Sequence, residues 1–193
     1  ILSFLGLFGV NSSKSESQFI KIENILKFSK VSEIKLKPLR KIEYDSNFSE
    51  FNTLIKNKKD ASDKYFFVTN NGRWTGFVDE NILKTVSLKK WERNFVGDFK
   101  KPIDSFESVS YNDKLWRTIE RLEETNEGFL LVLNAADIPL GIIDRSKIGN
   151  FVLNKLGFNL PSEIVNKLNF KNHYPLGIEL PRIINSMKQK GDL

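Results

Sequence analysis

The sequence of 193 residues contains no cysteine and only one histidine. Without cysteine, the chain can form neither a disulfide framework nor a thiolate metal site. With one histidine, it cannot build a zinc site from several imidazoles. A Ser-His-Asp triad would have to use His173, which stands in an ordinary polar segment near the end of the sequence. The composition therefore argues against a stand-alone enzyme and predicts neither a catalytic residue nor a metal site in this segment.

The chain also lacks a strong imbalance of charge. It has 30 basic and 24 acidic residues, and its formal net charge is +6. A mildly basic balance suits a solvated, lysine-rich surface, a nucleic-acid partner or an anionic membrane surface. The lysines are spread along the sequence and no aromatic–basic binding motif is present, so we expect no nucleic-acid partner. A solvated surface is the simplest interpretation.

No apolar run is long enough to span a membrane by itself. Residues 1–10 read ILSFLGLFGV, whereas a spanning helix needs about 20 apolar residues. The run lacks the basic start and the cleavage site of a signal peptide. It is either the end of a membrane helix or a segment that packs on the domain, and we expect the former. Polar residues at 11–17 predict a linker or a helix start, and apolar spacing predicts an amphipathic helix over 18–28.

One phrase occurs twice, as GFVDENIL at 76–83 and as GIIDRSKI at 141–148. Each copy has a glycine, two apolar residues, an aspartate, a polar stretch and an apolar residue. The similarity extends over a first copy at about 31–86 and a second at about 96–156, and loop changes shift the offset by only a residue or two. An internal repeat of this length predicts two similar units that bury surface against each other.

Each copy predicts the order strand, helix, strand, turn, strand, helix, which is a mixed α+β fold. The run at 65–78 places NNG between two apolar stretches, a strong hairpin signal, and the run at 129–143 repeats it with a looser turn. Pro139 stands near the start of a strand, where proline is tolerated. Because these strands are apolar at successive positions, we expect other elements to cover both of their faces.

Apolar stripes at helical spacing predict helices in the second copy and in the tail. The former has Asn112 or Asp113 as its expected N-cap. In the tail, Pro161 begins a short helix-like stretch, residues 174–177 predict a turn, and residues 180–189 predict a helix that covers one edge of the repeat or docks a partner. The stripes are Leu115, Trp116, Ile119 and Leu122, and Leu180, Ile183, Ile184 and Met187.

The ordered set of elements, written twice, resembles a pair of cystathionine-beta-synthase (CBS) domains, a Bateman module. The resemblance covers about residues 30–157 and implies a leading segment at 1–30, CBS units at 31–90 and 91–157, and a helical tail at 158–193. Each unit should form a small, mainly antiparallel sheet with flanking helices, and a pseudo-two-fold axis should relate the units. The family further implies a regulatory role in a larger protein, homodimerisation, and ATP, ADP or AMP in clefts between the units.

The repeated aspartate departs from the family's nucleotide-binding phrase. That phrase has a hydroxyl residue that meets a phosphate and, three positions later, an aspartate for the ribose. Here these positions are Asp79 and Ile82 in the first copy, and Asp144 and Lys147 in the second. A carboxylate repels a phosphate, whereas an aspartate between a strand and a helix is a favoured N-cap, and we prefer this second interpretation.

Three functional alternatives remain for this position. In the first, Lys147 or Arg145 contacts a phosphate of the ligand. In the second, a metal ion bridges a nucleotide to the carboxylates of Asp79 and Asp144. In the third, the clefts hold no ligand, and the CBS pair serves for dimerisation or docking. Trp74 and Trp116 could stack on a base, although packing is the simpler interpretation for each. The candidate ligand-binding residues are Asp79, Asp144, Arg145 and Lys147.

The tail segment YPLGIELPRI resembles the tail of site-2-type intramembrane zinc metalloproteases of photosynthetic bacteria and plastids, which carry a CBS pair after their last membrane helices. The apolar start at 1–10 fits that arrangement. The resemblance implies that the zinc and the catalytic HExxH residues lie upstream. It also implies that this segment sits at the cytoplasmic face of a membrane, joined to transmembrane helices. A channel or transporter is the alternative parent.

Overall fold

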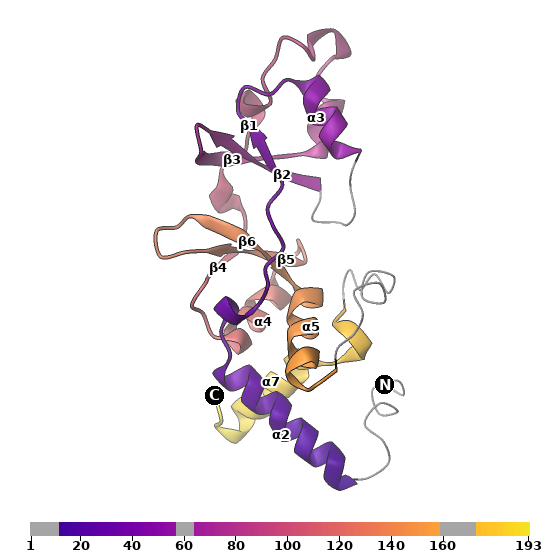
Figure 1. The fold of residues 1–193 in the computed structure, drawn as a ribbon, viewed down its shortest axis with the longest axis vertical. Helices are drawn as coiled ribbons and strands as arrows, with labels where there is room; N and C mark the ends of the chain where they lie inside the picture. Colours follow the sequence, from indigo (N-terminus) through magenta and orange to yellow (C-terminus); the bar gives the residue numbers. More distant parts are fainter. Residues whose placement is uncertain (1–11, 57–63, 159–172) are drawn as a thin grey trace.

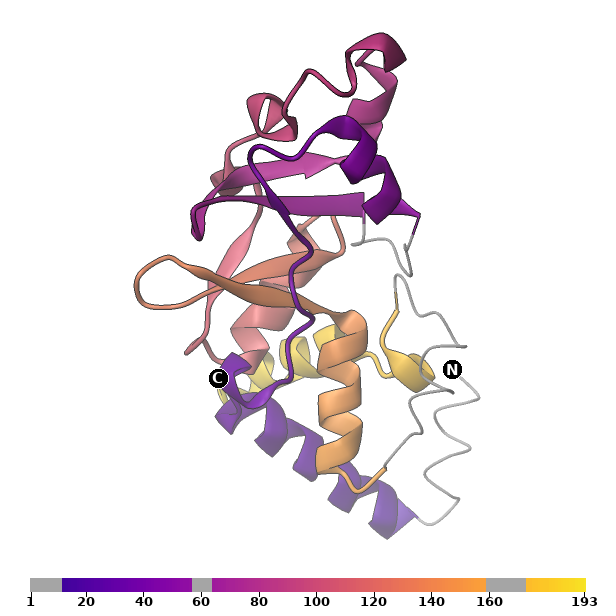
Figure 2. The ribbon, with the colours of Figure 1, turned by 45° about the horizontal axis from the view of Figure 1, so that its top comes forward.

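The computed structural model describes residues 12–56, 64–158 and 173–193, and these form an elongated molecule (Figure 1). A sheet with short helices occupies one end, a second sheet lies in the middle, and the longer helices gather at the other end. Seen from 45° away, the two sheets lie one above the other (Figure 2). Within the described residues, no helix is long and apolar enough to cross a membrane.

The two sheets repeat one topology. The first contains β1 (Lys41–Glu43), β2 (Tyr65–Asn70) and β3 (Arg73–Asp79), and the second contains β4 (Ser108–Ser110), β5 (Phe129–Leu133) and β6 (Pro139–Asp144). In each sheet the central strand pairs with a short parallel strand and a longer antiparallel one. The longer pairing is thus antiparallel, as expected, and a helix makes the crossover that the parallel pair requires.

Helices complete each unit. In unit 1, α3 (Phe48–Ile55) makes the crossover and the 3₁₀ helix η3 (Glu80–Lys84) follows β3. In unit 2, α4 (Leu115–Glu124) makes the crossover and α5 (Arg145–Lys155) follows β6. The predicted order of elements is confirmed in both units, with a short 3₁₀ helix as the last element of unit 1.

The hairpin predicted from NNG is present. Asn71 and Gly72 have φ values of 50° and 76°, and two positive φ values in a two-residue turn match the right-handed twist of the flanking strands. In the looser second hairpin, the Asn134 side-chain oxygen accepts from the backbone N–H groups of Ala136 and Ile138, both at 2.9 Å. Pro139 begins β6, as predicted.

The central strands are covered on both faces because their side chains alternate. In β2, Phe66 and Val68 point to a cluster under α3, whereas Tyr65 and Phe67 point to the other sheet. β5 repeats this division. The cluster between the sheets consists of Tyr65, Phe67, Phe77, Phe106, Phe129, Leu131 and Ile142. The expectation of strands buried on both faces is confirmed.

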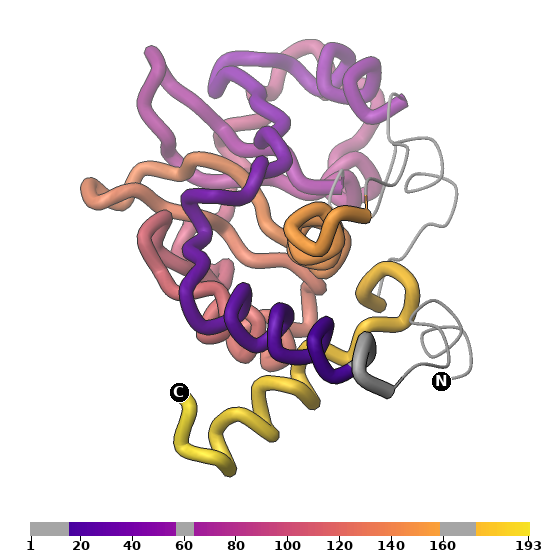
Figure 3. The backbone as a smooth tube through the Cα atoms, turned by 60° about the horizontal axis from the view of Figure 1, so that its bottom comes forward, coloured from indigo at the N-terminus to yellow at the C-terminus, as the bar shows by residue number. Residues whose placement is uncertain are grey.

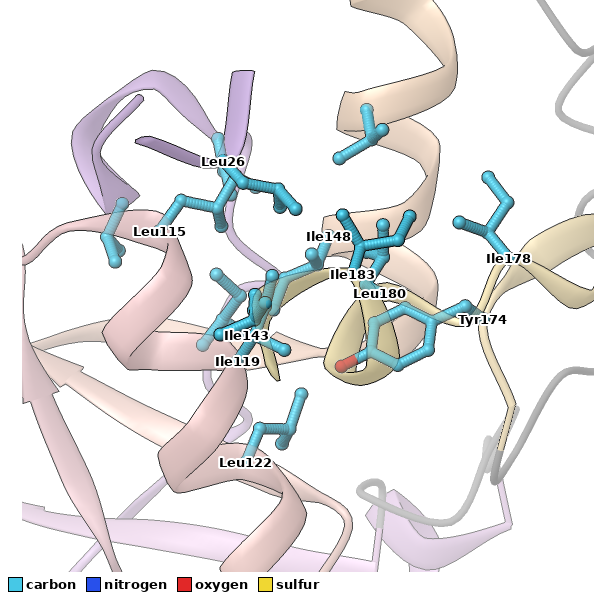
Figure 4. Close-up of a cluster of buried hydrophobic side chains, with 14 of the residues drawn as sticks. Leu26, Leu115, Ile119, Leu122, Ile143, Ile148, Tyr174, Ile178, Leu180 and Ile183 are labelled. Carbon is cyan, nitrogen blue, oxygen red and sulfur yellow. The ribbon is translucent and has the colours of Figure 1, made fainter. Parts of the chain in front are cut away.

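Two helices from opposite ends of the sequence enlarge the core of unit 2. These are α2 (Ser12–Phe28) and α7 (Leu180–Lys190), which contact each other and α4 (Figure 3). Figure 4 shows their side chains meeting those of α4, α5 and β6. The predicted tail stripe is buried, and α2 includes the predicted helix at 18–28 but begins at Ser12. The predicted helix start at Pro161 lies outside the described residues.

The N-cap predicted for α4 is wrong. Lys114 holds that position and makes no capping bond through its side chain, while the Asp113 carboxylate accepts from the Ser110 N–H at 2.9 Å. The reason lies at the end of α2, where the Ser29 carbonyl accepts from the Leu115 N–H at 2.9 Å. A backbone carbonyl that directly follows a distant helix thus satisfies a helix-start donor that a local side chain was expected to satisfy.

The segments that open the two repeats pack on the opposite units. Val31 and Ile34 are buried in the core of unit 2, and Lys37 exchanges two backbone hydrogen bonds of 2.9 Å with Ile142 in β6. In the same way, Val96 is buried in the core of unit 1, and Lys101 pairs with β3. Each opening segment therefore extends the other unit's sheet.

This crossing explains the glycine in the repeated phrase. A Cβ on Gly76 would lie 2.4 Å from the Lys101 carbonyl oxygen, and one on Gly141 would lie 2.8 Å from that of Lys37. Backbone cannot yield as a flexible side chain can, so both positions require a residue without a side chain. The same structural need produces the glycine twice.

Candidate functional site

The two repeated aspartates cap the helices that follow them. Asp79 Oδ1 accepts from the Asn81 N–H at 2.8 Å at the start of η3. Asp144 Oδ1 accepts from the Lys147 N–H, also at 2.8 Å, at the start of α5. The N-cap interpretation is confirmed for both residues. It accounts for the acid in the phrase without a ligand, and the predicted ligand contacts of these residues stay predictions.

At the start of η3, the charge of Asp79 is already balanced. Its Oδ2 lies 3.0 Å from Lys101 Nζ, on the segment that crosses from unit 2, and the side chain is only 17% exposed. Burial by itself raises the pKa of Asp79, but the hydrogen bonds from Lys101 and the Asn81 N–H outweigh it and hold the pKa below its ordinary value. The carboxylate is therefore ionised and paired.

Phe106 fills the space between the sheets beside β3. Its ring centroid lies 4.2 Å from that of Phe77, 4.9 Å from Tyr65 and 5.5 Å from Phe129. Contacts in this range are close packing between aromatic rings. The residues around Phe106 are almost fully buried, so on this side the interface between the units is a solid aromatic cluster.

At the start of α5, Arg145 is held by Glu123 of α4. Its Nε and Nη2 donate to the two carboxylate oxygens at 2.9 and 3.0 Å, and Nη2 also donates to the Leu122 carbonyl at 3.2 Å. The Tyr174 hydroxyl donates to the same carboxylate at 2.9 Å. This Arg145–Glu123–Tyr174 clamp joins α5, α4 and the tail, and a bidentate pair of this kind fixes geometry strongly. Arg145 is only 12% exposed.

Burial, followed by the nearby Glu123 charge, raises the pKa of the Tyr174 hydroxyl well above its ordinary value. The hydroxyl therefore stays protonated and keeps its role as a donor. Sequence reasoning missed this clamp because its three residues are separated by long stretches of chain and belong to no motif. The only local signal is a tyrosine directly before the turn at 175–177.

Lys147 is the candidate residue whose charge is left uncompensated. It is the third residue of α5 and is half-buried, and its ammonium group makes no hydrogen bond or ion pair with the described residues. The matching position in unit 1 is Ile82, which packs against the core of that unit. The two copies of the phrase thus present different chemistry at the same place.

Trp74 and Trp116, the two tryptophans considered for base stacking, pack against buried clusters. Trp74 meets Phe67 edge-on at 6.3 Å and carries Lys41 Nζ 5.0 Å from its ring centroid. Trp116 is half-buried, and the cations of Arg117 and Lys188 lie 5.0 and 5.2 Å from its ring centroid. The packing interpretation is confirmed for both.

A surface hollow lies elsewhere, on the outer side of α4. Charged side chains line it: Glu107, Arg117, Glu120, Arg121 and Glu124. Two of these form an ion pair of 3.1 Å, and neither aspartate of the phrase borders the hollow. In the part of the chain that the structure describes, no three acidic or imidazole side chains gather closely enough to hold a metal ion.

The architecture is similar to that of known CBS domains. The CBS domain of a bacterial CNNM/CorC family Mg²⁺ transporter in complex with ATP matches with a TM-score of 0.52 and 14% identity, over 76% of this chain and 99% of that one. Another structure of such a domain matches with a TM-score of 0.50 and 14% identity, over 76% and 86% of the two chains.

A protein from Mathanocaldococcus jannaschii matches with a TM-score of 0.50 and 19% identity, over 72% of this chain and 66% of that one. No protein-family model matches the sequence, and no curated protein matches it. The structural likeness shows the fold, which is that of a CBS domain pair, and the predicted α+β class is confirmed.

Proposed function

We propose that this chain is the regulatory module of a larger protein and that it senses an adenine nucleotide at the start of α5. The fold supports the first part, because it is that of a CBS pair. The similar transporter domain in complex with ATP supports the second. The observation that carries the choice of site is the difference in charge between the two copies of the phrase.

The start of η3 is unfavourable for a phosphate. Asp79 and Glu80 are both acidic, Ile82 replaces a polar residue, and Lys101 is already paired with Asp79. Phe106 also fills the adjoining space. A polyanion brought here would meet two carboxylates, and their repulsion grows as the surroundings become less polar.

The start of α5 offers a better balance. Lys147 supplies an uncompensated positive charge, and the N-terminus of this eleven-residue helix adds to the potential. The negative charge of Asp144 repels a phosphate that carries no metal ion. If Mg²⁺ accompanied the nucleotide, however, the Asp144 carboxylate would become a ligand of the metal ion. We therefore propose one nucleotide site per chain rather than two, with Lys147 on a phosphate.

A ligand at this place would act on the tail through Arg145. The clamp with Glu123 and Tyr174 joins the start of α5 to α4 and to the tail. A nucleotide that fits one arrangement of the clamp better than another shifts the balance between them, and it can do so only by that difference in affinity. The tail then transmits the state of the site to the rest of the protein.

Calorimetric titration with ATP, ADP, AMP and S-adenosylmethionine, with and without Mg²⁺, tests the proposal. Lys147→Ala should weaken nucleotide binding by roughly tenfold or more, because a hydrogen bond to a charged group is lost. Lys101→Ala, which removes a lysine beside the other aspartate, is the matched control and should leave affinity unchanged. Equal affinity in wild type and Lys147→Ala would refute the proposed site.

A ligand-free homodimerisation or docking scaffold is the second candidate. Both carboxylates of the phrase are already engaged as helix caps, and side chains fill the cluster between the sheets. In addition, Ile82 and Lys147 stand where the family's nucleotide-binding phrase has an aspartate for the ribose. These three observations favour the scaffold. Sedimentation equilibrium would detect the dimer. A persistent dimer that gives no heat with any nucleotide would favour this candidate over the sensor.

For the parent, we propose a membrane protein with this module at its cytoplasmic face. The apolar start at 1–10 and the tail resemblance support a site-2-type intramembrane zinc metalloprotease, whose zinc would lie outside this segment. The likeness to transporter domains supports a channel or transporter instead. The sequence upstream of Ile1 tests the choice: membrane spans with HExxH would support the protease, and spans without it would oppose it.

A further inference from the structure

The loop after η3 forms one tip of the molecule, at the opposite end from α2 and α7 (Figures 1 and 2). It contains a short 3₁₀ turn, η4 (Leu88–Lys90). Unlike the helices at the other end, this turn projects outward from the sheet. A turn that projects in this way is better placed to meet a flat or yielding partner than a ligand that needs a groove.

The tip carries much of the chain's surplus charge. Residues 84–93 contain four basic residues and one acidic residue, Glu92, in a chain whose net charge is +6. Lys89, Lys90 and Arg93 are exposed and form no ion pair within the described residues. The Lys84 ammonium donates to a neutral amide oxygen of Asn81 at 3.1 Å, which leaves its charge uncompensated. These four cations are therefore available to an anionic partner.

An aliphatic side chain stands among these cations. The Leu88 residue is 74% exposed, which is more than any other large apolar residue in the described part of the chain. Its position is fixed, because the Trp91 N–H donates to the Leu88 carbonyl at 3.2 Å and the Trp91 indole N–H donates to the Val86 carbonyl at 3.0 Å. The Trp91 carbonyl in turn accepts from the Phe48 N–H at the start of α3. The turn thus holds Leu88 outward.

We propose that this tip docks on an anionic lipid bilayer. The η4 patch, defined as Lys84, Leu88, Lys89, Lys90 and Arg93, would place Leu88 at the boundary between head groups and acyl chains. The four cations would lie among the lipid phosphates. Basic residues around an exposed apolar residue suit such an interface, where attraction to anionic lipid adds to apolar burial.

The exposed leucine favours a bilayer over a nucleic acid. Phosphate contacts with RNA or DNA need the cations but give an aliphatic side chain no apolar environment. The η4 patch is distant from the start of α5, and it includes none of the residues of the proposed nucleotide site. The proposal therefore does not depend on nucleotide binding, and its test needs no nucleotide.

Sedimentation with lipid vesicles tests the proposal on the whole 193-residue chain. The vesicles are phosphatidylcholine with phosphatidylserine at about three to one, compared with phosphatidylcholine alone, at low and high salt. Wild type should bind the anionic vesicles, and high salt should weaken the binding. Absence of binding to the anionic vesicles at low salt would overturn the proposal.

Charge reversal in the η4 patch is the decisive comparison. Lys89→Glu with Lys90→Glu should weaken vesicle binding by more than about tenfold, because each cation at the surface contributes a severalfold factor. The matched control reverses Lys21 and Arg73, which are exposed, lie on α2 and β3, and form no ion pair with the described residues. An equal loss in the control would overturn the proposal in favour of net charge alone.

The leucine separates a bilayer from other polyanions. Leu88→Ser should weaken vesicle binding severalfold at both salt concentrations, whereas Ile20→Ser, at a 52% exposed position on α2, should not. Unchanged vesicle binding in Leu88→Ser, or tighter binding of single-stranded RNA than of vesicles, would overturn the membrane proposal. Circular dichroism of each variant checks that these exposed substitutions leave the fold intact.

Discussion

Unit 1 and unit 2 have the same order of strands and helices but very different surroundings. Among the described residues, the outer core of unit 1 contains eight buried apolar residues, whereas that of unit 2 contains twenty. The difference comes from α2 and α7, which cover α4 and α5, whereas no helix in the described part of the chain covers α3 and η3 in this way. A repeat in sequence therefore does not imply equal stability, and local opening should be easier in unit 1.

The largest expected effect concerns the tail helix as part of the core of unit 2. Ile184 is fully buried in α7, so Ile184→Ala should lower the free energy of unfolding by about 2–5 kcal/mol. Urea unfolding followed by circular dichroism measures this change. Ile20→Ala, at an exposed position on α2, is the control. A change below about 0.5 kcal/mol for Ile184→Ala, the size typical of surface positions, would mean that the tail is not part of this core.

The glycines should reveal what the two units share. Gly76→Ala and Gly141→Ala should each lower the free energy of unfolding by about 1–3 kcal/mol, because a methyl group would meet the backbone of the crossing segment. Thermal unfolding of both variants beside Arg73→Ala, an exposed substitution in β3, measures the effect. If only one of the two glycines proves sensitive, the crossing contact is not equivalent in the two units.

The clamp belongs to unit 2 alone. Tyr174→Phe removes the hydroxyl that donates to Glu123 and should lower the free energy of unfolding by about 1–3 kcal/mol. Tyr111→Phe is a matched control, because that hydroxyl is exposed and its bond to the Ser32 carbonyl is long, at 3.3 Å. Hydrogen exchange should show faster opening of α7 but unchanged protection of β2. Faster exchange in both units would contradict a clamp confined to unit 2.

The smallest expected effect is a pH dependence confined to unit 1. Because the pKa of Asp79 is lowered in the folded state, its contribution is present above the unfolded pKa of about 3.9 and is lost as the pH falls through the folded pKa. Asp79→Asn should therefore reduce stability at neutral pH by about 1 kcal/mol or less and have little effect in strong acid.

Urea unfolding of wild type and Asp79→Asn across this pH range measures the difference. Lys101→Ala should produce part of the same change, because it removes the partner that lowers the pKa of Asp79. A stability difference that stays constant down to strong acid would show that the ion pair is not its source.

Local patterns predicted those features that depend on neighbouring residues. The NNG turn, the burial of β2 on both faces and the capping role of Asp79 and Asp144 each follow from the chemistry of a few adjacent positions. The contacts that join distant segments could not be predicted in this way. The Ser29 carbonyl satisfies the start of α4 in place of Asp113, because the chain brings the residue that follows α2 to that point.

The candidate site shows the same limit. The sequence singled out Arg145 and Lys147 by their place in the phrase, and only the structure separates them. Arg145 is bonded to Glu123, which also accepts from Tyr174. The ammonium group of Lys147, by contrast, makes no hydrogen bond or ion pair with the described residues. Lys101, which neutralises Asp79, belongs to the opposite repeat, and aligning the repeats gives no indication that it would cross over.

The crossing of the two opening segments also bears on how such a pair can be divided. A cut between the repeats would leave unit 1 without the segment that carries Val96 and Lys101, and unit 2 without the one that carries Val31 and Lys37. Each half would expose an unpaired strand edge, which invites aggregation. Each half supplies a segment to the sheet and the core of the other. We therefore expect either half to fold stably only when the other is present.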